Sequence, residues 1–196
     1  MVRTGPFSPE IRRLERLTMK LILAFSLAAV AITSAPLANA QIDTKNPVVW
    51  AANDVYARQS KFIVAAAEAM PADKFTYKPT EGQWTYGKII SHIALANAHV
   101  CAMLNDSTAP ANLTIAETAS KPDLVAALKA SFAFCDAAMN GLTDNKLGDT
   151  ITFFGGHKVP RARALIEEAG DLEDHYSQMA MYLRLNNITP PSAAKK

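Results

Sequence analysis

The stretch 165-LIEEAGDLEDHYSQMAMYL-183 decides the fold class of this chain. Its apolar residues recur in alternating steps of four and three, which is the spacing of an α-helix packed into the seam of a bundle. The helix is expected to begin near Pro160 and to end at about Asn186, before the Pro190-Pro191 pair. Its seam consists of Leu165, Ala169, Leu172, Tyr176, Met179 and Leu183.

Three earlier stretches, 47–70, 85–104 and 121–142, show the same helical periodicity. Asn46 can cap the first, and Ser120 with Asp123 forms an S-x-x-D start signal for the third. The segment 151-ITFFGG-156 can be extended, but one such segment does not make a sheet. The sequence therefore predicts an all-α four-helix bundle, with two inter-helix loops long enough to cross over the bundle.

A secretory signal is expected before the bundle. Lys20 is followed by an apolar run, Leu21 to Ile32, and by the small-residue cleavage site Ala38-Asn39-Ala40. We expect residues 1–40 to be a leader whose natural start is Met19, 41–192 to be the bundle and 193–196 to be a tail. The protein is then periplasmic or secreted, with no stable membrane span after cleavage. An uncleaved membrane anchor is the alternative.

The charge of the chain argues against a polyanionic partner. The whole sequence has 20 Lys+Arg and 18 Asp+Glu, a net charge of +2. The leader carries the excess, because 15 basic and 16 acidic residues remain without it, a net charge of −1. Neither nucleic acid nor an anionic membrane surface is predicted to bind.

The two cysteines, Cys101 and Cys135, do not have the spacing of a zinc motif. An even count in an oxidising compartment permits one disulfide. Two small buried apolar residues are the alternative interpretation.

A candidate metal site comes from two helices. Asp171 and His175 are four residues apart and therefore lie on the same side of the last helix, and His92 is central in the second. Two imidazoles and a carboxylate suit a divalent cation that keeps a position open for water or ligand. An ordinary pair one turn apart is the alternative. We expect His99 to be buried or at the rim, and His157 to be solvated.

Three segments resemble the DinB-like family, also known as the YfiT-like metal-dependent hydrolases. They are WTYGKIISHIA at 84–94, CDAA at 135–138 and DHYSQMAMYLRLNNITPPS at 174–192. The resemblance implies a four-helix bundle of unusual connectivity with a three-histidine metal site. His92 and His175 match two of the ligand positions, whereas the third falls on Asp171. The metal expected at this site is zinc, nickel, iron or manganese, and the resemblance admits a homodimer.

Two functions from different classes follow, beside the third possibility of a structural, disulfide-stapled domain whose polar stripe is inert. One is a metal-dependent hydrolase or group transferase that acts on a small molecule, in which the metal activates water or a thiol. Characterised relatives use low-molecular-weight thiols, but these are cytoplasmic and the leader argues against a direct transfer of that activity. The other is a non-catalytic exported bundle that binds a small ligand or a protein partner.

Overall fold

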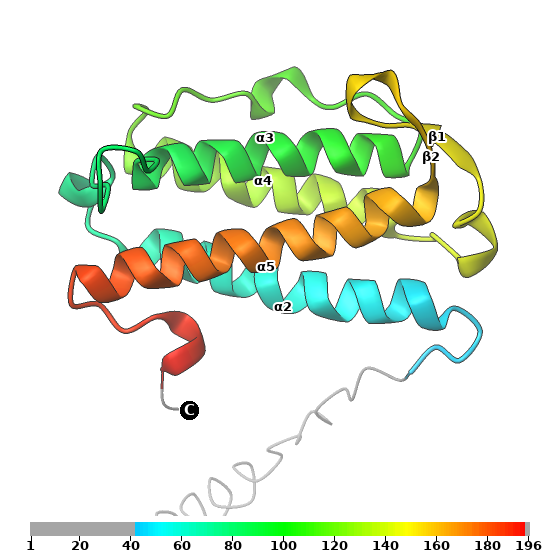
Figure 1. Ribbon diagram of the computed structural model, residues 1–196, viewed down its shortest axis with the longest axis horizontal. Helices are drawn as coiled ribbons and strands as arrows, with labels where there is room; N and C mark the ends of the chain where they lie inside the picture. The colour runs from blue at the N-terminus through cyan, green and yellow to red at the C-terminus, as the bar shows by residue number, and fades with distance from the viewer. Residues whose placement is uncertain (1–41, 195–196) are drawn as a thin grey trace, which may run out of the picture. The chain divides into compact units, whose positions relative to one another are not determined.

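The computed structural model describes residues 42–194, which form four long α-helices and a short β-hairpin (Figure 1). The helices are α2 (Pro47–Ala69), α3 (Tyr86–Leu104), α4 (Lys121–Met139) and α5 (Arg161–Leu185). The prediction of an all-α four-helix bundle is confirmed. The expected leader, 1–40, lies outside the described residues.

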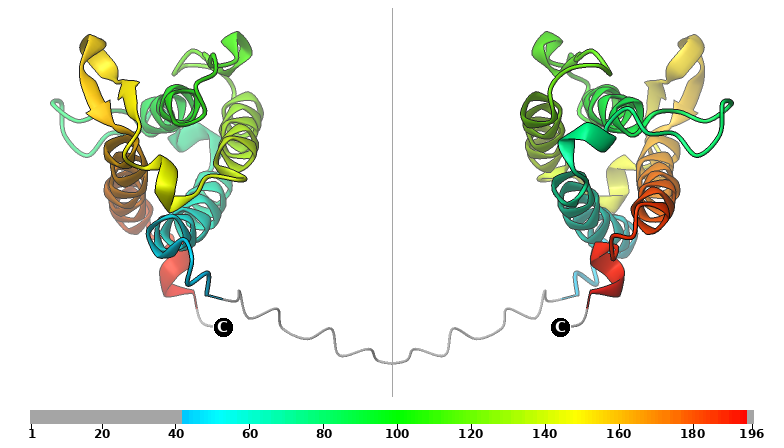
Figure 2. Two further views of the ribbon diagram at one scale, coloured as in Figure 1. Left: turned by 90° about the vertical axis from the view of Figure 1, so that its right-hand side faces the viewer. Right: turned by 90° about the vertical axis from the view of Figure 1, so that its left-hand side faces the viewer.

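The connectivity is not that of a simple up-and-down bundle. α3 packs against both α4 and α5, while α2 packs chiefly against α5 and more lightly against α4. α2 and α3 therefore lie diagonally opposite each other in the bundle, and so do α4 and α5. The connection within each of these two pairs crosses an end of the bundle (Figure 2). This arrangement brings α3 and α5 side by side, which the candidate metal site requires.

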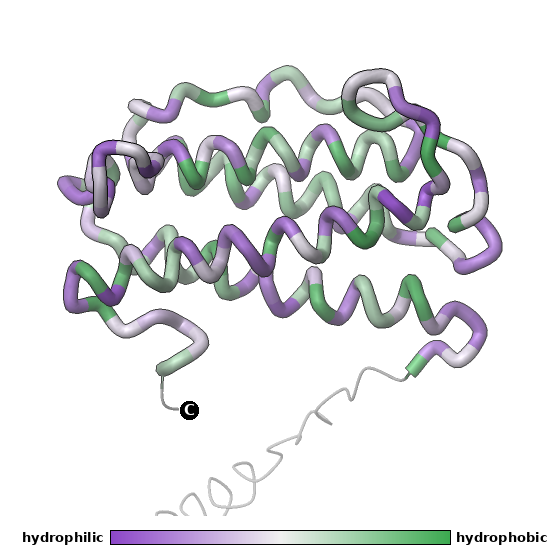
Figure 3. Tube along the Cα trace, viewed as in Figure 1, coloured by the Kyte–Doolittle hydropathy of each residue, from purple (hydrophilic) through white to green (hydrophobic). Residues whose placement is uncertain are grey.

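Aliphatic side chains fill the core between the helices. Hydrophobic and hydrophilic residues alternate along the helices (Figure 3). Burial of each large aliphatic side chain stabilises the fold by roughly 1.5–3 kcal/mol. The side chains with almost no exposed surface include Ile63, Ile89, Ile90, Ile93, Leu124, Leu128, Leu165, Leu172 and Met179. α3 is long and apolar enough to cross a membrane, but 61% of its most apolar stretch is buried in the bundle, as in the core helix of a folded domain.

The start of α4 shows an expected cap, and the start of α2 an unexpected one. Ser120 accepts a hydrogen bond from the backbone N–H of Asp123, as the S-x-x-D signal predicts. Asn46 does not cap α2 with its side chain. Instead the carboxylate of Asp144 accepts hydrogen bonds from Val48 N and Val49 N at 3.0 and 2.9 Å. Asn46 Oδ1 accepts a hydrogen bond from the backbone N–H of Asp144, so the Asn46 side chain holds the segment that carries the capping carboxylate.

The segment after α4 corrects the expectation for 151–156. β1 (Thr150–Thr152) pairs in antiparallel with β2 (Lys158–Pro160), so a two-stranded hairpin forms where one isolated extended segment was expected. Gly155 and Gly156 both have positive φ, +69° and +79°, in the connecting turn. This conformation favours glycine and reverses the chain.

Candidate metal centre

Neighbouring faces of α3 and α5 bring together the three residues that the sequence selects. Asp171 and His175 lie one turn apart on α5, and His92 faces them from α3. One ligand atom from each of the three lies within 4.8 Å of the other two. The geometric requirement for a shared site is therefore met.

The donor set fits a divalent cation with small adjustments. Two donor atoms that each lie about 2.1 Å from one metal are at most about 4.2 Å apart. The three donors lie within 4.8 Å of one another, so their separations exceed that limit by at most about 0.6 Å. Two imidazoles and a carboxylate leave further coordination positions open, as catalytic sites do.

His175 is the least satisfied of the three side chains. It is 5% exposed, and neither ring nitrogen has a hydrogen-bond partner among residues 42–194. Its Nε2 lies 3.4 Å from Asp171 Oδ2, which is within ion-pair distance but lacks hydrogen-bond geometry. A buried polar group without a partner costs free energy, on the order of 1–3 kcal/mol. A cation bound between these side chains would be coordinated by one of these two ring nitrogens.

The electrostatics keep two of the donors in the protonation state that metal binding requires. Burial lowers the pKa of His92, and the nearby His175 and Lys88 lower it further, against the opposing charge of Asp171. The contact with His175 lowers the pKa of Asp171, against partial burial. At neutral pH His92 is therefore a neutral imidazole and Asp171 a carboxylate.

Trp84 covers this group of side chains, a role that the sequence alone does not reveal. Its ring centroid lies 4.8 Å from that of His92 and 6.4 Å from that of His175. Tyr182 Oη donates a 2.7 Å hydrogen bond to the Trp84 carbonyl, which fixes the segment before α3. Lys88 lies 5.3 Å from the centroid of the Trp84 ring. Trp84 therefore forms a wall of the site.

The remaining histidines lie away from the site. His99 is exposed on α3, so the expectation of a buried or rim position is wrong. His157 is exposed beside the glycine turn, as expected. Glu173 and Asp174 are also exposed and form side-chain hydrogen bonds to Gln59 and Gln178, respectively.

A second group of potential ligands does not form a metal site in this state. Cys101 and Cys135 are bonded to each other as a disulfide that joins α3 to α4. Their sulfurs therefore carry no thiolate. Glu168 lies beside them, 3% exposed, with Oε1 3.9 Å from Cys135 Sγ, and burial raises its pKa to about 8. The sequence did not suggest a buried carboxyl group at this position.

The model of one protein family, the DinB superfamily, matches residues 57–179, which is more than half of the chain. This chain belongs to the DinB superfamily. The matched segment contains all three candidate ligands. None of the curated proteins matches the sequence.

Solved structures show the same superfamily fold. A DinB-like protein of Bacillus subtilis is 20% identical, with a TM-score of 0.59 over 74% of this chain and 94% of that one. A DinB-like protein of Bacillus cereus ATCC 10987 is 18% identical, with a TM-score of 0.57 over 71% and 93%. The mycothiol-dependent maleylpyruvate isomerase is 16% identical, with a TM-score of 0.54 over 67% and 60%. Similarities at these identities establish a shared fold.

Proposed function

We propose that this DinB-superfamily protein binds one divalent metal ion through His92, Asp171 and His175, and uses it in hydrolysis or group transfer on a small molecule. The observation that supports the proposal is the convergence of the three donors within 4.8 Å, with neither nitrogen of the buried His175 hydrogen-bonded to any of residues 42–194. A metal with open positions lowers the pKa of a bound water or thiol and polarises a substrate oxygen.

The protein side chains would supply the ligands and the surroundings. His92 and His175 would each donate one ring nitrogen, and Asp171 one carboxylate oxygen. Trp84 lies against the ligand rings on one side, and Lys88, which is paired with Glu117 at 3.6 Å, lies next to the Trp84 ring.

The direct test is metal binding by protein that has been stripped with chelator. Calorimetric titration with zinc, nickel, manganese and iron(II) should show one site per chain in the wild type. His92→Ala and His175→Ala should each lose that site, whereas His99→Ala, which removes an exposed imidazole from the same α3 helix, should keep it. Wild-type protein that binds none of the metals, or His92→Ala that binds as tightly as wild type, would overturn the proposal.

The departure from three histidines favours one second candidate, a non-catalytic exported bundle that binds a small organic ligand or a partner. Asp171 stands where the family resemblance implies a histidine. In this second case chelator leaves the thermal stability unchanged, whereas an organic ligand raises it. Loss of stability in chelator, recovered with metal, favours the metal-dependent function.

Export to the periplasm or the exterior is part of the same proposal. It is supported by the signal-like sequence of residues 19–40. Intact mass of the protein recovered from expressing cells tests it. A chain that begins at Gln41 in the exported fraction is expected, and a full-length chain in the cytoplasm would contradict export.

A further inference from the structure

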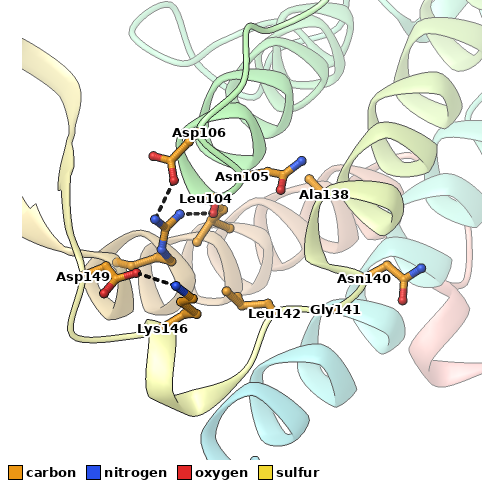
Figure 4. A pocket seen from close by; sticks show the side chains of 10 residues that line it. Leu104, Asn105, Asp106, Ala138, Asn140, Gly141, Leu142, Lys146 and Asp149 are labelled. Carbon is orange, nitrogen blue, oxygen red and sulfur yellow. Dashed lines mark hydrogen bonds and ion pairs between the residues drawn. The ribbon is translucent and has the colours of Figure 1, made fainter.

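A cavity of about 230 Å³ lies near one end of the bundle, away from the candidate metal centre (Figure 4). It forms where α3 and α4 end and where α5 begins, and the segment before β1 closes it. Leu104, which ends α3, and Arg161, which begins α5, both line it. His92 and His175 are 12 and 14 residues away along their helices, which corresponds to about 20 Å. The cavity is therefore separate from the metal centre.

Arg161 is the buried cation of this cavity. It is 7% exposed and donates hydrogen bonds to the Leu104 carbonyl and, at 2.7 Å, to Asp106 Oδ2. Its Nε is buried without a hydrogen-bond partner among residues 42–194. A guanidinium offers five N–H donors, so its capacity to bind a carboxylate is not used up by these two contacts.

A second ion pair lines the same cavity. Lys146 Nζ lies 3.7 Å from Asp149 Oδ2, and their side chains are 62% and 47% exposed (Figure 4). Such exposed pairs contribute about 0–1 kcal/mol. A ligand with its own charges can therefore replace this contact at little cost.

The charges of the lining favour a ligand that carries both signs. Arg161 and Lys146 supply two positive charges, while Asp106 and Asp149 supply two negative ones. The carboxyl ends of α3 and α4, at Leu104–Asn105 and Asn140, add the negative ends of two helix dipoles. In the structure Arg161 is paired with Asp106 and Lys146 with Asp149, so the side chains of the lining carry no net charge and favour neither a simple anion nor a simple cation.

We propose that this cavity binds a small zwitterion with one carboxylate and one ammonium group, of the size of a free amino acid. The carboxylate contacts Arg161 and Lys146, and the ammonium contacts Asp149 and the helix-terminal carbonyls. The volume of about 230 Å³ is below the roughly 300–1,000 Å³ of pockets for drug-sized ligands, which agrees with a small ligand.

Calorimetric titration of the purified protein with L-alanine and glycine tests the proposal, with acetate and methylamine as probes that carry one charge each. Both zwitterions should bind saturably, and the two single-charge probes should bind at least tenfold more weakly. His92→Ala should bind the zwitterions like the wild type, which separates this result from the fate of the metal proposal.

Substitutions of exposed residues test the ligand contacts without unfolding the protein. Lys146→Met and Asp149→Asn should each weaken L-alanine binding at least tenfold. Lys129→Met removes a lysine of similar exposure, paired with Glu68 elsewhere on the bundle, and should change nothing. Absence of saturable binding by the wild type, acetate binding equal to that of L-alanine, or unchanged binding by Lys146→Met would overturn the proposal.

Discussion

Asp171 Oδ2 and His175 Nε2 lie 3.4 Å apart across one turn of α5, at ion-pair distance but without a hydrogen bond. The pair can act in two ways. Both residues can bind the metal, or Asp171 can orient His175 while the histidine binds alone, as carboxylates often support ligating histidines. The two cases differ in what the loss of Asp171 costs.

Asp171→Asn should weaken zinc binding by more than the roughly 10- to 100-fold that loss of a supporting residue costs. The reason is that the amide is a poorer donor and the anionic ligand is lost. Asp171→His should keep a zinc site, because it completes a three-histidine set. Competition titration against a chelator of known affinity measures both. Asp174→Asn, an exposed acid on the same helix, is the control, and a loss within 100-fold for Asp171→Asn would instead assign an orienting role.

Glu168 should make the stability of metal-free protein depend on pH. Burial raises its pKa from 4.5 to about 8, so the folded state holds a proton that the unfolded state releases. The contribution of Glu168 to stability is therefore full below about pH 4.5 and decreases as the pH rises towards about 8, by up to roughly 1.4 kcal/mol per pH unit.

Denaturant unfolding at several pH values measures this effect. Glu168→Gln removes the titrating group and should be much less sensitive to pH over this window, whereas the exposed Glu173→Gln should behave like the wild type. Identical pH profiles for wild type and Glu168→Gln would show that the carboxyl group does not titrate in this way.

The Cys101–Cys135 disulfide closes a separation of 34 residues between α3 and α4. In the chain-entropy account a loop of this size stabilises the fold by roughly 3–4 kcal/mol. The double variant Cys101→Ala, Cys135→Ala should lose stability of this order in urea unfolding. Unreduced, unfolded wild type should show no free thiol, and two free thiols per chain would exclude the bond.

Asp144 should stabilise α2 although it lies about 95 residues away in sequence. Its carboxylate caps the first turn through Val48 N and Val49 N. Asp144→Ala should lower the free energy of unfolding by about 0.5–2 kcal/mol, the usual effect of losing a cap. Asp54→Ala, an exposed acid within α2, should have a much smaller effect, and equal effects of the two variants would contradict the capping role.

The sequence predicts most of this architecture because the four long helices carry strong local signals. Their boundaries fall close to those expected, since Pro47, the Ser120 cap and the Asn186-Asn187 pair act locally. The hairpin escaped prediction because strands of three residues are too short to show alternation. The capping role of Asp144 was not predicted because its partners, Val48 and Val49, are distant in sequence.

The candidate site was predictable only in part. Residues Asp171 and His175 share a face by helix geometry alone, but their proximity to His92 depends on α3 and α5 being neighbours. The sequence around Trp84 does not reveal that its ring covers the donors. The sequence around Glu168 does not reveal that its carboxyl group is buried beside a disulfide. These positions result from packing between helices.

The most direct test of the proposed metal centre is a crystal structure of zinc-loaded protein with anomalous diffraction measured at the zinc edge. We predict one zinc ion per chain within bonding distance of His92, Asp171 and His175 together. Zinc bound elsewhere, or a donor set left without zinc under saturating conditions, would contradict it.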